Sequence, residues 1–283
     1  MDLIKKKLLK DFLPETVEAF KEYNLIDDPL FTKAAEDKKF CEEILRTILG
    51  DPELVVVRNT PQAKLQNLKG RSVVLDALCR LKGGVMVDIE VQKTDNDDHL
   101  RRVRYNGAAL TTNITKTGTK FCEVPNVIII FISTFDIFKD GYALYHVDKI
   151  VRESSRKVED GLEEIYVNSA VKDGSKVSEL MKLFVDFKAY NKDEFPVVSE
   201  SKRFYKETEE GARAMCEITE KYGKKLYKKG EKQGFAEGEA KGILFTLKNM
   251  METLKLAPEK ALEVCKIPSG ERSFYLEKLK EVK

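Results

Sequence analysis

Short runs of apolar and β-branched residues predict a set of strands in the first two thirds of the chain. Two of them, 72–79 and 85–92, flank the turn signal Lys82-Gly83-Gly84 and therefore predict a β-hairpin. The unbroken run 127–132 is typical of a strand that is covered on both faces. Further strands are expected at 54–58, 142–150 and 162–168.

Helical patterns surround these strands. An apolar stripe predicts a helix over 38–49, which Gly50 would end. Other helices are expected from Asp97 or Asp98 to about Thr112, at 177–190, and from about residue 200 onwards. Strands between two layers of helices predict a three-layer α/β core. We expect a helical lead-in at 1–24, an α/β domain at 25–195 and a helical C-terminal region at 196–283.

The two faces of the hairpin predict its register. A three-residue loop at 82–84, with Gly84 in the left-handed conformation, places Asp76 opposite Glu90. One face then carries the polar side chains, namely Asp76, Leu78, Asp88, Glu90 and Gln92. The other face is wholly apolar, with Leu75, Ala77, Cys79, Val87, Ile89 and Val91. A two-residue loop would mix the faces, so the pattern favours the longer loop.

Two carboxylates opposite one another repel unless a proton or a cation lies between them. Oxygen ligands suit Mg²⁺ or Mn²⁺, so Asp76 and Glu90 are candidate metal ligands. The alternative is a structural acid pair that a Lys or Arg bridges. Asp88 shares their face and would either bind a second metal or stay solvated; we favour solvation.

Asp76 and the run Ile89-Glu90-Val91-Gln92 resemble the motif of the PD-(D/E)XK nuclease superfamily, and more narrowly its Rpn-like branch of recombination-promoting nucleases and transposases. Further segments resemble that branch in the same order along the chain: Asp27-Asp28-Pro29-Leu30-Phe31, Arg102-Val103-Arg104-Tyr105, 127–136, Ile165-Tyr166-Val167-Asn168 and the glycine-spaced tail. The motif departs at Gln92, where the superfamily usually has Lys, and no Pro precedes Asp76. The neighbouring Lys93 would point to the opposite face of a regular strand.

The resemblance implies a restriction-endonuclease-like fold, a mixed sheet flanked by helices with a helical C-terminal extension. It also implies a Mg²⁺- or Mn²⁺-dependent endonuclease whose partner is DNA. Asp76, Glu90 and Gln92 would be catalytic, with the metal on the two acids. Nucleases of this fold often place a helix acid near the metal, and Glu43 is the candidate here; the alternative is an ordinary surface glutamate.

The helix after the hairpin carries candidate DNA contacts at Arg101, Arg104 and Tyr105. Arginines beside a metal site would bind backbone phosphates, which supply most non-specific affinity. The alternatives are a solvated helix face for the arginines and core packing for Tyr105.

Composition narrows the setting. The formal net charge is only +2, so a nucleic-acid surface would be local. Five scattered cysteines without a C-x-x-C pair suggest a reducing compartment and exclude a standard zinc ribbon. No run is long enough to span a membrane, and the start lacks a signal-peptide apolar region. We therefore expect a cytoplasmic protein without a membrane partner.

Glycines recur every four residues in the tail, at Gly230, Gly234, Gly238 and Gly242. Each costs a helix about 1 kcal/mol relative to Ala. Such a row lets a second helix approach closely, which favours a homo-oligomer; the alternative is a flexible linker.

Two classes of function fit the sequence. The first is a metal-dependent DNA endonuclease that promotes recombination or is linked to mobile elements. The second is a catalytically weak or inactive DNA-binding or oligomerising protein derived from such a nuclease.

Overall fold

The computed structural model describes the chain except residues 1–3, 5–6, 68–69 and 282–283. The chain forms two compact units, Met1–Glu220 and Lys221–Lys283. The first unit contains the predicted α/β core, and the second is helical. None of the helices in the described part of the chain is long and apolar enough to cross a membrane.

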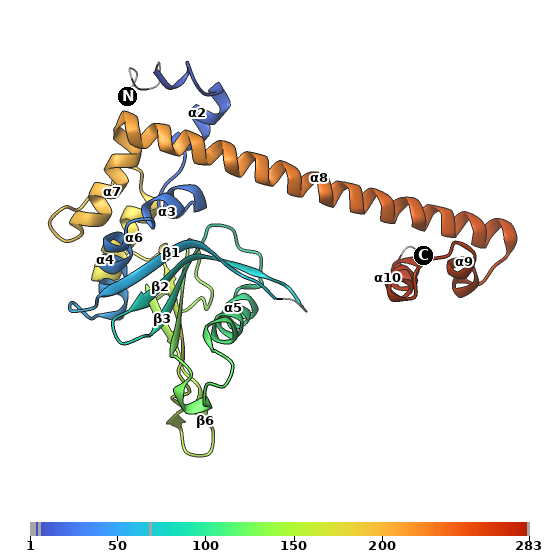
Figure 1. The fold of residues 1–283 in the computed structure, drawn as a ribbon, viewed down its shortest axis with the longest axis horizontal. Coiled ribbons are helices and arrows are strands. Elements are labelled where there is room, and N and C mark those ends of the chain that lie inside the picture. Colours follow the sequence, from blue (N-terminus) through green and yellow to red (C-terminus); the bar gives the residue numbers. More distant parts are fainter. Residues whose placement is uncertain (1–3, 5–6, 68–69, 282–283) are drawn as a thin grey trace. The chain divides into compact units, whose positions relative to one another are not determined.

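A six-stranded mixed sheet forms the centre of the first unit (Figure 1). Its order is β1-β2-β3-β4-β8-β5. β1, β2 and β3 are antiparallel, β3, β4 and β8 are parallel, and β5 returns antiparallel at the edge. The bounds are β1 (Val56–Leu65), β2 (Val73–Leu81), β3 (Met86–Gln92), β4 (Val127–Ser133), β5 (Leu144–Val147) and β8 (Leu162–Asn168).

Helices cover both faces of this sheet. The larger core cluster joins one face to the helices α3 (Asp28–Ala34), α4 (Lys38–Leu49), α6 (Lys176–Val185) and α7 (Pro196–Glu207). The smaller cluster joins the other face to α5 (His99–Ile114). Figure 1 shows α4 and α6 on one side of the strands and α5 on the other. The restriction-endonuclease-like α/β fold class predicted from the sequence is confirmed.

The predicted hairpin register is also confirmed. Leu78 pairs with Asp88, and Ala77 pairs with Ile89. Gly84 has a φ of +95°, a conformation that suits glycine, and its N–H donates to the Leu81 carbonyl at 3.0 Å. One face prediction is wrong: Leu75 packs in the smaller cluster on the α5 side. The neighbouring strand β1 is irregular beside Leu75, where Gln62 has a φ of +50°.

Several element ends differ from the sequence pattern. β1 extends beyond Arg58 to Leu65 and includes Pro61, which an edge strand tolerates because its outer N–H groups need no partner strand. The predicted strand at 142–150 divides into β5 and the two-residue strand β6 (Ile150–Val151), which pairs with β7 (Arg156–Lys157). The helix predicted at 177–190 ends at Val185.

The remaining elements are helical. α2 (Pro14–Lys21) precedes the core, and the short 3₁₀ helix η1 (Phe121–Glu123) lies between α5 and β4. The helix α8 (Glu209–Leu254) leads into the second unit, where α9 (Pro258–Val264) and α10 (Ser269–Glu281) follow. A small cluster that includes Leu247, Leu262 and Tyr275 forms the core of that unit.

Candidate active site

The two acids of the sequence motif meet across the hairpin. The main-chain N–H of Asp76 donates to Oε1 of Glu90 at 3.1 Å, and the N–H of Val91 donates to Oδ2 of Asp76 at 3.0 Å. Each carboxylate therefore accepts an N–H group from the opposite strand. From the other side, Nε2 of Gln62 donates to Oδ1 of Asp76 at 3.3 Å. The alternation of apolar and polar residues and the glycine turn are what place these two acids together.

Asp88 adds a third acid to the same face, two positions before Glu90. It is fully buried, so the expectation that it stays solvated is wrong. The solvent is excluded because α5 covers this face of the sheet. Neither Asp88 carboxyl oxygen forms a hydrogen bond of good geometry with another described residue, although the side chains of Glu90 and Asn106 lie close enough to act on its pKa. A carboxyl group that is buried with so few polar contacts is costly when ionised, so this position favours a proton or a cation.

Arg102 of α5 is the cation that contacts the cluster. One guanidinium nitrogen lies 3.3 Å from Oε2 of Glu90, and the other donates to Oε1 of Gln92 at 2.7 Å. Gln92 in turn donates to the Thr94 carbonyl at 2.7 Å. The alternative prediction, an acid pair bridged by a Lys or Arg, is thus met in part, because Arg102 contacts Glu90 but does not bridge it to Asp76. A single guanidinium cannot balance three carboxylates, however, so the arginine alone does not explain the cluster.

The pKa values of the three acids reflect first their burial and then the charges of their neighbours. Burial raises the pKa of Asp76 and of Asp88 well above the usual range, and the charge of Glu90 raises both further. Burial also raises the pKa of Glu90, although Arg102 opposes it. The acids therefore hold protons more strongly than ordinary carboxylates, and a cation that binds them would displace protons.

A fourth acid, Asp28, acts on this cluster. Its charge raises the pKa of both Asp76 and Glu90. It is the first residue of α3, and Lys93 holds the preceding Asp27 at 2.9 Å, which ties this helix start to the end of β3. The sequence pattern did not predict Asp28 as a site residue, although its segment resembles the family. The feature that could have indicated it is the pair of acids, Asp27 and Asp28, directly before Pro29.

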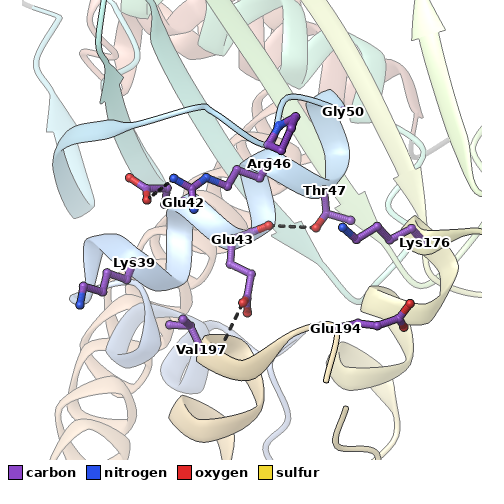
Figure 2. Close-up of a pocket in the computed structure, with 10 residues that line it drawn as sticks. Lys39, Glu42, Glu43, Arg46, Thr47, Gly50, Lys176, Glu194 and Val197 are labelled. Carbon is purple, nitrogen blue, oxygen red and sulfur yellow. Dashed lines mark hydrogen bonds and ion pairs between the residues drawn. The ribbon is translucent and has the colours of Figure 1, made fainter. Parts of the chain in front are cut away.

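Glu43 has other partners than the acid cluster. Its carboxylate accepts the N–H groups of Val198 at 2.7 Å and Val197 at 3.3 Å, at the start of α7. It lies in a charged pocket of about 600 Å³ together with Lys176 and Glu194 (Figure 2). Periodicity placed Glu43 on the correct helix but could not tell which element that helix face meets. The geometry is that of a helix cap.

The candidate DNA contacts lie on the surface of α5. Arg101 and Arg104 are exposed, and Tyr105 is 37% exposed. The Tyr105 hydroxyl donates to the Arg71 carbonyl. Arg102, which lies between the two exposed arginines in the sequence, turns inward to the acids instead. The helix thus presents one arginine to the cluster and two to the solvent.

A comparison with known families matches residues 28–236 to the PD-(D/E)XK nuclease family transposases. The matched segment is more than half of the chain. This chain belongs to that family. The match includes both motif acids, Asp28 and the whole of α5. No curated protein and no solved structure matched the chain in the corresponding comparisons.

PD-(D/E)XK nucleases generally use divalent metals, and the donor set of this site is compatible with one. All of its carboxylates are hard oxygen donors. Burial, together with the charges of Glu90 and Asp76, raises the pKa of Asp88, so a cation bound here would ease the ionisation of this carboxyl. No group of three or more Asp, Glu, His or Cys side chains among the described residues is arranged to hold a metal. The fit therefore rests on two facing carboxylates, Asp76 and Glu90, rather than on a complete cage.

We predict that Asp88→Asn stabilises the protein in EDTA, increasingly as the pH rises. Because the folded-state pKa of Asp88 is raised, stability falls as the pH rises from the unfolded-state pKa towards the folded-state pKa, since the unfolded chain ionises first. The amide removes this loss, and a gain of at least about 1 kcal/mol corresponds to each pKa unit removed. Thermal unfolding across the pH range in which the folded protein is stable measures it.

The matched control is Glu159→Gln, which neutralises an exposed carboxylate and should leave the pH dependence unchanged. If Asp88→Asn instead destabilises the protein at every pH, the ionised carboxylate has a stabilising partner and the cluster has no deficit of positive charge.

Proposed function

We propose that this protein is a metal-dependent DNA endonuclease that hydrolyses a phosphodiester bond. The observation that carries the proposal is the facing of Asp76 and Glu90 across the hairpin, in a buried cluster with more acids than cations. Membership of a nuclease family makes DNA the expected substrate. The family also motivates a role in recombination or in mobile elements.

Each acid has a definite place in this proposal. Asp76 and Glu90 would hold Mg²⁺ or Mn²⁺, which would polarise the phosphate and lower the pKa of a bound water. The N–H groups of Asp76 and Val91 fix the two carboxylates from the opposite strands. Arg102 orients Glu90 and offsets part of its charge. The site is therefore held in place by main-chain geometry before any ligand binds.

Gln92 takes the position where the superfamily usually has Lys. Its side-chain oxygen is held by Arg102 and its amide nitrogen by the Thr94 carbonyl. An amide cannot titrate, but it can orient a water by hydrogen bonds. To donate to a water, Gln92 would exchange its contact with Thr94, since Arg102 already fixes the oxygen. We propose that Gln92 positions the attacking water and does not accept its proton.

Surface residues of α5 would hold the DNA strand. Arg101 and Arg104 are exposed and lie next to Arg102 on α5. They could therefore contact the phosphates of a strand that is bound at the acid cluster. Tyr105, which is 37% exposed, would contact the sugar or phosphate. We place this activity in the cytoplasm; the five cysteines are free thiols, which suits a reducing compartment.

A second candidate is a DNA-binding protein without turnover. The contact of Arg102 with Glu90 and the replacement of Lys by Gln92 favour it, because the first already neutralises one acid and the second removes a titratable group. The two candidates share the site and differ only in hydrolysis.

Plasmid cleavage separates them. We predict that the full chain nicks supercoiled DNA with Mg²⁺ or Mn²⁺ and not in EDTA. Asp76→Ala and Glu90→Ala should each lower the rate by about 100-fold or more, since even indirect supports of metal ligands cost 10- to 100-fold. Glu159→Ala removes an exposed carboxylate and serves as the control.

Cutting at the same rate by wild type and both acid variants would contradict the proposal. DNA binding without cutting, in the wild type and in the variants, would support the second candidate.

We also propose that the glycine-spaced part of α8 pairs with a second copy of the chain. An added Cβ at Gly230, Gly234, Gly238 or Gly242 meets nothing within 4 Å, so packing within this chain does not require these glycines. Sedimentation of the full chain should give a mass above the 32.3 kDa monomer, and a version that ends at Tyr227 should lose it. A monomeric full chain would overturn the pairing.

A further inference from the structure

A groove of about 570 Å³ lies on the α5 side of the sheet, beside the hairpin turn. Strands β1, β2 and β3 form its floor, and the end of α5 with the segment that follows it forms a wall. The lining residues are Arg58, Thr60, Leu78, Arg80, Gly84, Met86, Ile114, Thr115, Lys116, Thr119, Glu123 and Pro125. This groove is separate from the residues that contact Asp76 and Glu90.

Two arginines of the groove are direct cross-strand partners. Arg58 of β1 pairs with Arg80 of β2. Like charges directly opposite one another destabilise a sheet. Neither arginine, nor Lys116 just after α5, forms a hydrogen bond or ion pair through its side chain to another described residue. All three side chains are exposed. The fold therefore maintains an unfavourable concentration of positive charge at this place.

The remaining lining fits an anion with many oxygen atoms. Thr60 and Thr119 bring hydroxyl groups that can donate to phosphate oxygens, whereas the Thr115 hydroxyl already donates to the Thr111 carbonyl at 2.6 Å. Glu123 is the one acidic residue among those that line the groove. Three cations against one acid leave a local excess of positive charge, in a protein whose whole formal charge is only +2.

The sheet register connects this groove to the acid cluster. Arg58, Arg80 and Met86 form one row across three strands, and Thr60, Leu78 and Asp88 form the next row. Rows two residues apart are separated by about 7 Å along a strand. The Asp76 and Glu90 row is therefore about 13 Å from the arginine row, which is about four nucleotides of axial rise at 3.4 Å each.

We propose that this groove, with Arg58, Arg80 and Lys116, binds the phosphate backbone of a DNA strand a few nucleotides away from the acid pair. The inference rests on the proposed function, since that function supplies the DNA. The groove would hold the strand at a fixed number of nucleotides from the cleavage position. Its contacts are to phosphates, so it would not select a base sequence.

Direct binding tests the groove without requiring hydrolysis. The full chain is titrated into a labelled DNA duplex in EDTA, at salt concentrations from about 50 to 200 mM. Arg58→Gln, Arg80→Gln and Lys116→Gln are combined in one variant. Each lost phosphate contact should reduce the salt slope by about 0.9, and three should weaken binding at least tenfold at about 100 mM salt.

Two controls sharpen the result. The variant Arg152→Gln with Lys188→Gln removes two exposed cations outside the groove and should bind as the wild type does. Glu123→Gln removes the acid of the groove and should tighten binding. Because Arg58 and Arg80 repel one another, their replacement should not lower the melting temperature, which separates a binding role from a structural one.

An unchanged affinity and salt slope in the triple variant would overturn the inference while leaving the proposed nuclease untouched. The inference also fails if the triple variant binds DNA normally and loses only the binding of an acidic peptide, polyglutamate. If the wild type binds DNA but never cuts it with Mg²⁺, the proposed nuclease fails, and a weakened triple variant still supports the groove.

Discussion

The burial of three carboxylates against one guanidinium is the constraint on which the site depends. Asp76, Asp88 and Glu90 lie on one face of the β2–β3 hairpin, and α5 removes them from solvent while its one cation in contact with them, among the described residues, is Arg102. Such an arrangement costs free energy in the isolated protein, because ionised carboxyl groups lose their hydration. The cost is retained at a place where a divalent cation would offset it. That excess of buried carboxyl groups over cations is what distinguishes this cluster from an ordinary structural ion pair.

The fold holds this cluster by main-chain geometry. The glycine turn sets the register, and the register places the carboxylates where they accept N–H groups from the opposite strand. The same register continues toward the turn, where it aligns Arg58 with Arg80 on the same face. A single β-sheet face therefore carries an acidic centre and, about two rows away, a basic groove. These two positions suit a polyanionic ligand. Its phosphates would contact the basic groove directly and would meet the acids through a bound cation.

The sequence predicted those features that alternate along the chain. The apolar face of the hairpin determined the facing of Asp76 and Glu90, and the unbroken run at 127–132 predicted the central strand β4. Features that depend on distant contacts were missed. Leu75 joins the cluster on the α5 side, and Gln62 of the neighbouring strand departs from regular strand geometry at the same level of the sheet. Asp88 is buried because α5 crosses it, and Glu43 caps α7, a helix more than 150 residues later in the chain.

The central claim is that the buried acids form a cation site, and a calorimetric titration with Mn²⁺ tests it most directly. The full chain is titrated in two buffers with different ionisation enthalpies. Because Asp76, Asp88 and Glu90 have raised pKa values, binding should release protons to the buffer. Asp76→Ala and Glu90→Ala should both abolish the binding. Saturable binding that persists in both variants, or no binding by the wild type at neutral pH, would contradict the claim.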